Sequence, residues 1–504
     1  MVAAVASSSF DSGVASVCVV LQCEETRVRK VRYVFDTLLM AAGIAVTYSE
    51  LPPADGVWIL YASAKNPKFA PELCVAIAHC PEAWGLFDGD RDVEVSHLAD
   101  GLPIVLPGFG DGFVQPAVDI AFDIIANAFY FLSSWSERLS AKHGGGRQLY
   151  ANSIQRRLGI PLDIVDRYLE RLIAALSAAV DRAGQRRVSS PEPWPAGGEF
   201  AVVLSHDVDF VPGGIADIAK QGAKSVLRHL LRERNIPDAL RAARGLLAAG
   251  LAQRDPYGCI PDLIERETAL GVQASFQVAV GHRHPSDVNY YIENDTTRDY
   301  LKQITDAGFE LCLHGSYRST EKSEWYADEV ALLATRLSRP AGSRQHFLSF
   351  DYDALFAAQE AAGIQYDMSM GFPDQVGPRA GFSFPYFPYC LKEDRPYNVV
   401  QISLFLMDVT MRGYLNLKLE DAENLINQTL QSLRRKGGCV SVVWHPILFG
   451  GARDPGYDTL FWNLIRETRS NNGWPTDGRS VNHRWRDHAA RYASFSNYAV
   501  QQAC

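Results

Sequence analysis

Apolar runs that end in polar residues recur through the second half of the chain. The first run is Ala201–Leu204, and the polar segment Ser205–Asp209 follows it at once. Short apolar runs of this kind are typical of buried strands in a parallel sheet. Because side chains alternate along a strand, Asp207 and Asp209 are expected to point to the same side.

Two carboxylates on one face of a strand repel each other, and this pair has two interpretations. In the first, a metal ion binds one carboxylate and the other acts as a base or an acid. In the second, Asp207 and Asp209 cap a helix or are solvated loop acids. The segment by itself favours neither interpretation.

Three later apolar runs also end in residues that can do chemistry. These runs deliver His314, then Arg344 together with His346, and finally His445. The carboxyl ends of parallel strands meet at one edge of a sheet. We therefore expect these side chains to converge with the two acids on one site.

In this order, the four segments resemble the polysaccharide deacetylase family, whose members are metal-dependent N- and O-deacetylases with a distorted (β/α) barrel. The resemblance covers roughly residues 195 to 450. It implies that Asp207 is the general base and that Arg344 orients it. It further implies that Asp209 and His314 bind the metal and that His445 is the general acid.

One position departs from the family pattern. The family has a second ligand His four residues after the first, and this chain has Arg318 there. Arg cannot bind a cation, because it has no lone pair to donate and stays charged. We expect His346 to replace it, since it lies two residues after Arg344 and shares its face if the strand continues; the alternative is a His hydrogen-bonded in the barrel wall. His282 and His284, in a polar loop, are weaker substitutes.

Three more polar residues have two interpretations each. Asp367 either holds Arg344 or a substrate hydroxyl, or starts a turn. Arg379 is either a substrate contact or a surface residue. Asp408 ends another apolar run and either lies near the catalytic face or caps a helix.

The first part of the chain alternates apolar and amphipathic segments. Strands are predicted over Val14–Leu21 and Gly56–Tyr61, with a helix over Val31–Met40 between them. Residues 117–132 and 160–180 predict further helices, and the whole pattern indicates a small α/β layer. It resembles the accessory domain that precedes the barrel in a divergent branch of the family, and a scaffold role is expected for it.

Pro, Gly and Ser are concentrated in residues 186–199, which predicts an interdomain connection. The expected fold class is therefore α/β, with a smaller α/β accessory domain over residues 1–190. A deacetylase-like (β/α) barrel with a C-terminal extension is expected over residues 195–504. That extension, residues 474–498, covers the barrel mouth, forms an oligomer contact or packs as a tail.

Bulk composition narrows the classes of partner. The net charge of −9 and the pI of about 5.8 give no basic surface for nucleic acid. The nine cysteines lie mostly in apolar runs and are expected to be reduced. We expect a cytoplasmic protein without membrane contact, because no basic region precedes the apolar N-terminal stretch and no segment has the length of a span. Residues 226–251 predict an amphipathic helix with a solvated basic face.

Together these patterns predict a metal-dependent deacetylase that removes an N-acetyl group from a soluble, amino-sugar-containing small molecule or glycoconjugate. The expected metal is Zn²⁺, held by Asp209, His314 and His346, because ligation by both His and carboxylate suits zinc. Two alternatives stay open. One is a metal-dependent amidohydrolase that acts on a non-sugar amide, and the other is an inactive carbohydrate-binding barrel that lost its metal with Arg318.

Overall fold

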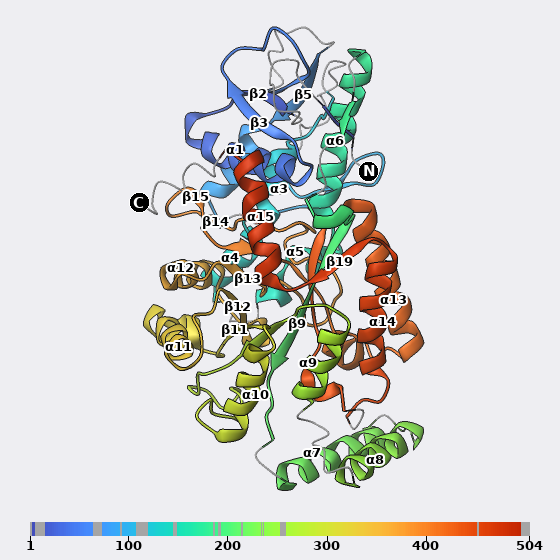
Figure 1. Cartoon of the computed structure of the whole chain (residues 1–504). Helices are drawn as coiled ribbons and strands as arrows, with labels where there is room; N and C mark the ends of the chain where they lie inside the picture. The colour runs from blue at the N-terminus through green and yellow to red at the C-terminus, as the bar shows by residue number, and fades with distance from the viewer. Residues whose placement is uncertain are drawn as a thin grey trace. The chain divides into compact units, whose positions relative to one another are not determined.

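The computed structural model forms two compact units (Figure 1). The first comprises Met1–Pro195, Pro378–Asn398 and His483–Cys504, and the second comprises Ala196–Gly377 and Val399–Asn482. The structure describes residues 3–5, 16–63, 73–90, 93–106, 119–144, 149–184, 187–189, 193–212, 215–232, 234, 236–251, 259–450 and 453–494. The expected division at about residue 190 did not anticipate that two later segments belong to the first unit.

The second unit is built on a nine-stranded sheet that curls into an open, distorted barrel. All neighbouring strands are parallel, in the order β16-β13-β12-β11-β10-β9-β18-β17, and β19 pairs with the first half of β9. The strands are β9 (Phe200–Val208), β10 (Ser275–Val278), β11 (Glu310–Gly315), β12 (Gly342–Gln345), β13 (Tyr366–Asp367), β16 (Val400–Gln401), β17 (Leu404–Met407), β18 (Cys439–Val443) and β19 (Gly473–Thr476).

Helices alternate with these strands, so the predicted α/β barrel class is confirmed. They are α7 (Ile215–Leu227), α8 (Ile236–Leu251), α9 (Ile260–Ala269), α10 (Asp295–Asp306), α11 (Ser323–Arg336), α12 (Tyr352–Ala362), α13 (Leu419–Lys436) and α14 (Tyr457–Ser470). In α13, the buried residues Ala422, Ile426, Leu430 and Leu433 recur every three or four positions. This spacing places one apolar stripe against the sheet. None of the helices in the described part of the chain combines the length and the apolar character needed to span a membrane.

Every residue of β9 is buried, including the polar Ser205, His206 and Asp207 that follow its apolar run, as expected for a central parallel strand. The register sets Asp207 opposite Gln277 of β10, and His314 of β11 opposite Arg344 of β12. Since all these strands run in the same direction, the residues at their carboxyl ends lie along one edge of the sheet.

The first unit contains a four-stranded parallel sheet in the order β3-β2-β4-β5. These strands are β2 (Ser16–Gln22), β3 (Ala45–Ser49), β4 (Trp58–Ser63) and β5 (Cys74–His79), and the main helices are α1 (Val28–Ala41), α3 (Ile124–Leu132), α4 (Trp135–Lys142) and α6 (Ile164–Arg182). The predicted α/β layer is thus present. Helix α3 begins later than predicted, because the Asp123 carboxylate accepts a hydrogen bond from Ala126 N and caps it.

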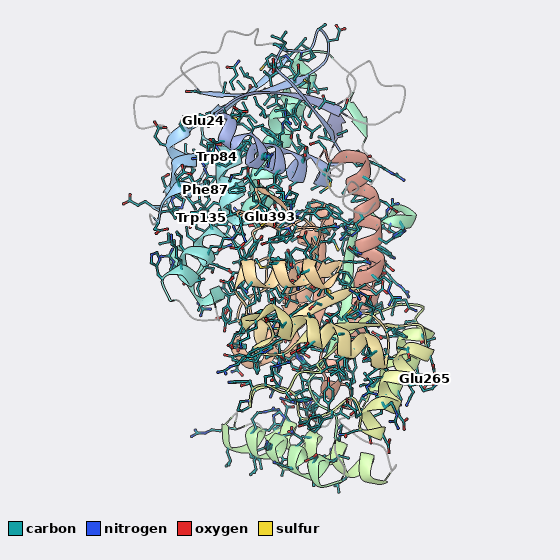
Figure 2. The ribbon with its side chains drawn as sticks, turned by 90° about the vertical axis from the view of Figure 1, so that its left-hand side faces the viewer. Glu24, Trp84, Phe87, Trp135, Glu265 and Glu393 are labelled. Atoms are coloured by element: carbon teal, nitrogen blue, oxygen red, sulfur yellow. The ribbon has the colours of Figure 1, made fainter. Side chains whose placement is uncertain are left out.

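Aromatic side chains form much of the core of the first unit. Trp84 packs against Phe87 with ring centroids 5.5 Å apart, and Phe87 meets the edge of Trp135 at 5.1 Å (Figure 2). Such pairs contribute more than their buried area alone. These aromatic contacts add to the stability of the first unit, whose sheet has only four strands.

One prediction about the connections needs correction. Part of the predicted linker is the strand β8 (Arg187–Ser189), which pairs with β1 (Ala3–Val5). The C-terminal extension begins as the strand β19, which pairs with Phe200–Val203, the half of β9 opposite to the two acids. The helix that follows, α15 (Gly478–Tyr492), buries Trp485, and the last residues of the extension lie outside the described residues.

We predict that Gly342→Ala destabilises the second unit by about 1–3 kcal/mol. A Cβ at Gly342 would lie 2.1 Å from Tyr366 Cζ, and Tyr366 is buried, with its hydroxyl donating to Glu310. Urea unfolding measures the loss. Gly413→Ala is the control, since its Cβ would lie at an ordinary 3.6 Å from Val409, and equal midpoints for both variants would contradict the close packing.

Candidate active site

Asp207 and Asp209 lie at the carboxyl end of β9, where alternation sends both toward the barrel interior. His206 points the other way, since its Nε2 lies 3.0 Å from Glu267 on α9 and its Nδ1 donates to the Trp444 carbonyl. The strand thus brings both acids to the same side of the sheet edge, with Asp207 buried and Asp209 partly exposed.

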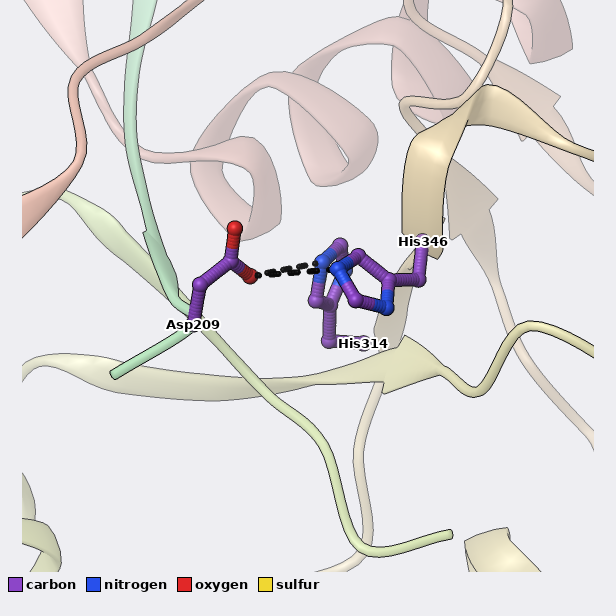
Figure 3. A group of neighbouring side chains, drawn as sticks. All are labelled: Asp209, His314 and His346. Carbon is purple, nitrogen blue, oxygen red and sulfur yellow. Dashed lines mark ion pairs between the residues drawn. The ribbon is translucent and has the colours of Figure 1, made fainter. Parts of the chain in front are cut away.

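Asp209, His314 and His346 converge at this edge of the sheet. Their candidate ligand atoms all lie within 4.8 Å of one another. His314 Nε2 is 3.2 Å from Asp209 Oδ1, and His346 Nε2 is 3.7 Å from the same oxygen. Figure 3 shows both imidazole rings directed at this carboxylate. The structure therefore brings together the three residues that the sequence selected as ligands.

The donor set of this cluster fits a divalent cation. Asp209 Oδ1 and His314 Nε2 are buried, and among the described residues neither has a hydrogen-bond partner. His314 Nδ1 lies 3.0 Å from the Arg344 carbonyl, and donation to that oxygen leaves the lone pair on Nε2. Buried polar atoms without a partner are costly, and a bound cation removes that cost. Two His nitrogens and a carboxylate oxygen are ligands that zinc accepts.

Arg344 holds Asp207 from the side. Its guanidinium is completely buried and donates to Asp207 Oδ1 at 2.5 Å, to Ser205 Oγ at 2.9 Å and to the Met368 carbonyl at 3.0 Å. Three acceptors around one planar group fix its orientation. Asp207 is thereby held in place with its second oxygen 4.0 Å from His314 Nε2.

His445 follows β18 and is held by Asp408, which follows the neighbouring strand β17. His445 Nδ1 donates to Asp408 Oδ1 at 2.8 Å, and its backbone N–H donates to Oδ2 at 2.6 Å. This arrangement turns His445 Nε2 toward the cluster, 3.3 Å from Asp209 Oδ2. Asp408 therefore lies at the catalytic face. The sequence signal for it was an acid at the end of an apolar run.

The surrounding charges keep both acids ionised. Burial raises the pKa of Asp207, but the Arg344 guanidinium, with smaller contributions from His314 and His445, outweighs it and the pKa lies below its ordinary value. Burial also opposes ionisation of Asp209. There the neighbouring His residues, His346 first, hold the pKa well below its ordinary value.

The three His residues differ in their preferred charge. Burial lowers the pKa of His445, but Asp408 and Asp209 outweigh it and raise this pKa well above its ordinary value. At His346 burial outweighs the nearby acids, and the pKa lies below its ordinary value. At His314 the two acids outweigh burial and raise the pKa. A divalent cation can replace that proton, because the same acids favour it.

The other candidate ligands lie elsewhere. Arg318 is about half exposed and lies 3.6 Å from Glu321, outside the cluster. The His282 ring packs on Tyr291 with centroids 4.1 Å apart, and the His284 ring stacks on a different tyrosine. Neither His belongs to the cluster of Asp209 and its two partners.

Asp367 starts a turn, as one of its two interpretations proposed. It accepts hydrogen bonds from the backbone and hydroxyl of Ser369 and from Gln359 Nε2. Burial raises its pKa to about 6, and these hydrogen bonds offset only part of the effect. Both interpretations of Arg379 were wrong, because it is buried in the first unit and forms two hydrogen bonds of 2.7 Å with Glu137.

An exposed aromatic residue lies directly beside the cluster. Phe347 has 52% of its surface exposed, and its ring stacks on the His346 ring with centroids 4.2 Å apart. Its edge contact with Tyr317 spans 5.9 Å. The backbone of Phe347 is left-handed, with φ of 57°, which is rare for an aromatic residue and places strain next to a candidate ligand.

Comparison with known proteins gives limited similarity. Residues 19–181 match DUF7033, a family of unknown function. No curated protein matches the chain by sequence. These residues cover about a third of the chain, so the family of the whole chain is not defined by the match.

Three solved structures show weak similarity. A Mycobacterium smegmatis protein assigned as a polysaccharide deacetylase has 17% identity and a TM-score of 0.40, over 58% of this chain and 92% of that one. Puue allantoinase has 15% identity and a TM-score of 0.37, over 59% and 94%. The 4-alpha-glucanotransferase from Thermococcus litoralis has 10% identity and a TM-score of 0.32, over 56% and 40%. The function therefore has to rest on this chain's own residues.

We predict that the purified protein binds about one divalent metal ion per chain. Asp209→Ala, His314→Ala and His346→Ala should each remove most of this metal, since each substitution deletes a ligand. Elemental analysis after gel filtration measures the content. Arg318→Ala is the control and should retain the wild-type content; equal metal in all four variants would rule out the site.

Proposed function

We propose that the second unit is a metal-dependent hydrolase that removes an N-acetyl group from an amino-sugar-containing substrate. The observation that carries the proposal is the cluster of the partly exposed Asp209 with the buried His314 and His346. An ionised acid, Asp207, lies on one side of it and a protonated His445 on the other. Amide hydrolysis needs both an activated water and a proton for the departing amine.

Asp207 is the proposed general base. The Arg344 guanidinium keeps it ionised at neutral pH, and the hydrogen bond of 2.5 Å keeps one oxygen engaged. The other oxygen is left to take a proton from the attacking water. An ionised acid that is held in position can accept this proton at little cost in reorganisation.

His445 is the proposed general acid. Its Nδ1 is held by Asp408, so its Nε2 is the nitrogen that faces the cluster and carries the transferable proton. The raised pKa keeps that proton on the ring at neutral pH. His445 can therefore give it to the nitrogen of the amine as the carbon–nitrogen bond breaks.

Asp209, His314 and His346 are the proposed ligands of the cation, with zinc as the proposed metal because two His and one carboxylate suit it. A bound divalent ion polarises a carbonyl oxygen and lowers the pKa of a coordinated water. The lowered pKa of His346 favours this role, since only the neutral ring has a lone pair to donate. The complete ligand set disfavours the alternative of an inactive barrel.

Phe347 favours a sugar over a non-sugar amide. Its exposed ring is an apolar face next to His346, and aromatic faces pack well against the apolar face of a sugar ring. The experiment that separates the two is a substrate panel with the zinc-loaded protein. N-acetylated amino sugars should release acetate, and cyclic ureides should give no product. Turnover of ureides alone would replace this proposal with the amidohydrolase.

We predict that Asp207→Asn retains the metal and loses about 10²–10⁴-fold in kcat. The amide is nearly isosteric but cannot accept the proton of the water. His445→Gln should lower kcat over a similar range, because it removes the proton donor. Acetate release and metal content are measured on the same preparations. A variant of Asp207 with wild-type turnover would disprove its role as the base.

We further predict that Phe347→Ala raises KM for an acetylated amino sugar about tenfold and leaves metal content unchanged, because one stacking contact contributes about 1–2 kcal/mol. Phe347→Tyr should retain the wild-type KM, since it keeps the ring. If Phe347→Ala changes neither KM nor kcat, the sugar does not contact this ring.

A further inference from the structure

Helices α7 and α8 expose an unusual amount of apolar surface. The sequence predicted a solvated basic face for residues 226–251, yet large aliphatic side chains are exposed here. They are Leu227, Leu230, Leu231, Ile236, Leu240 and Leu247, with exposed fractions between 41% and 75%. Exposed apolar groups that cluster in this way mark an interaction surface.

The two helices pack as a pair that extends from the carboxyl end of β9 (Figure 1). Gly222 allows their close approach, because a Cβ there would lie 2.4 Å from Leu246 Cδ1. The inward contact thus uses Leu246, while the neighbouring Leu247 is 68% exposed. The exposed aliphatic residues are therefore not the ones that hold the pair together.

On each helix several of the exposed residues share one face. Lys220, Lys224, Leu227 and Leu231 follow one another at intervals of four, three and four, which places them on one face of α7 and its continuation Arg228–Arg232. On α8, Ile236, Leu240, Arg244 and Leu247 follow at intervals of four, four and three, which also places them on one face. Each face therefore combines aliphatic and cationic side chains.

The charge of this segment is opposite to that of the whole protein. Residues 215–251 contain seven Lys and Arg against three Asp and Glu, a net charge of +4, whereas the whole chain carries −9. Aliphatic side chains beside cationic ones are the pattern of a helix that lies in the headgroup region of an anionic bilayer.

The pair is attached to the barrel next to the candidate active site. Ser225 Oγ donates to the Arg453 carbonyl at 2.8 Å, and Arg228 donates to Asp454 at 2.6 Å. Arg453 and Asp454 belong to the connection that follows β18, the strand that delivers His445. A surface bound by α7 and α8 would therefore lie at the same edge of the sheet as the cluster.

We propose that the exposed face of α7 and α8 binds the surface of an anionic lipid bilayer. The aliphatic side chains enter the boundary between headgroups and acyl chains, and the cationic side chains contact the headgroups. This inference differs from the expectation of no membrane contact. It is independent of the proposed function, because binding to vesicles is measured without turnover.

The test is co-sedimentation of the full chain with vesicles. Wild-type protein should bind vesicles of phosphatidylglycerol mixed with phosphatidylcholine, and binding should weaken at high salt and on phosphatidylcholine alone. The double substitution of Leu231→Asp and Leu247→Asp should reduce binding about tenfold or more. Leu51→Asp is the matched control, since Leu51 is 71% exposed but lies in the first unit, and it should bind as wild type.

Two results would overturn the proposal. One is equal vesicle binding by the double variant and the Leu51→Asp control. The other is a wild-type dimer, measured by light scattering, that the double variant converts to a monomer, because the face would then belong to a second copy of the chain. The double substitution of Lys220→Glu and Lys224→Glu separates the contribution of charge to vesicle binding from that of the aliphatic side chains. It should lower binding only to the anionic vesicles.

Discussion

Two ionised carboxylates side by side at the carboxyl end of one barrel strand are the constraint on which the second unit depends. Asp207 is buried, and removing such a charge from water costs several kcal/mol; repulsion from the partly exposed Asp209 adds to this cost. Asp207 is compensated by the Arg344 guanidinium at 2.5 Å. Asp209 faces His nitrogens at 3.2 Å, 3.3 Å and 3.7 Å, so its compensation is complete only with positive charge on them or between them. The same requirement that makes the pair costly makes it a candidate cation site.

The positively charged and polar groups that stabilise the two acids are brought to them by the parallel sheet, and not by residues that are close to the acids in sequence. Each group comes from the end of a different strand, and the order β12-β11-β10-β9-β18-β17 places these ends side by side. Asp408 and His445 show the principle, because they are 37 residues apart and meet through the pairing of β17 with β18. A site assembled this way is as rigid as the sheet. Its rim, carried by loops, can vary without disturbing the cluster.

Whether a site residue could be predicted depended on how far apart in sequence it and its contact partner are. Residues within one strand or at its end, such as Asp209 and His346, follow from alternation and from the carboxyl-edge rule. The holding role of Asp408 was not predicted, since an acid after an apolar run can equally cap a helix. Arg379 was misinterpreted because its partner Glu137 is 242 residues away, in a helix that no local pattern connects to it. For the same reason, the assignment of 378–398 to the first unit could not be read from composition.

The position of His346 in the cluster has a structural consequence. With His346 in the cluster, one strand end carries both the group that orients the proposed base, Arg344, and a candidate ligand two residues later. The Arg344 carbonyl also accepts a hydrogen bond from His314 Nδ1. This one segment therefore helps to orient the proposed base Asp207 and both candidate His ligands, His314 and His346. Displacement of this segment would move the proposed base and the ligands together. The left-handed backbone at Phe347, directly after it, is the local strain that this arrangement accommodates.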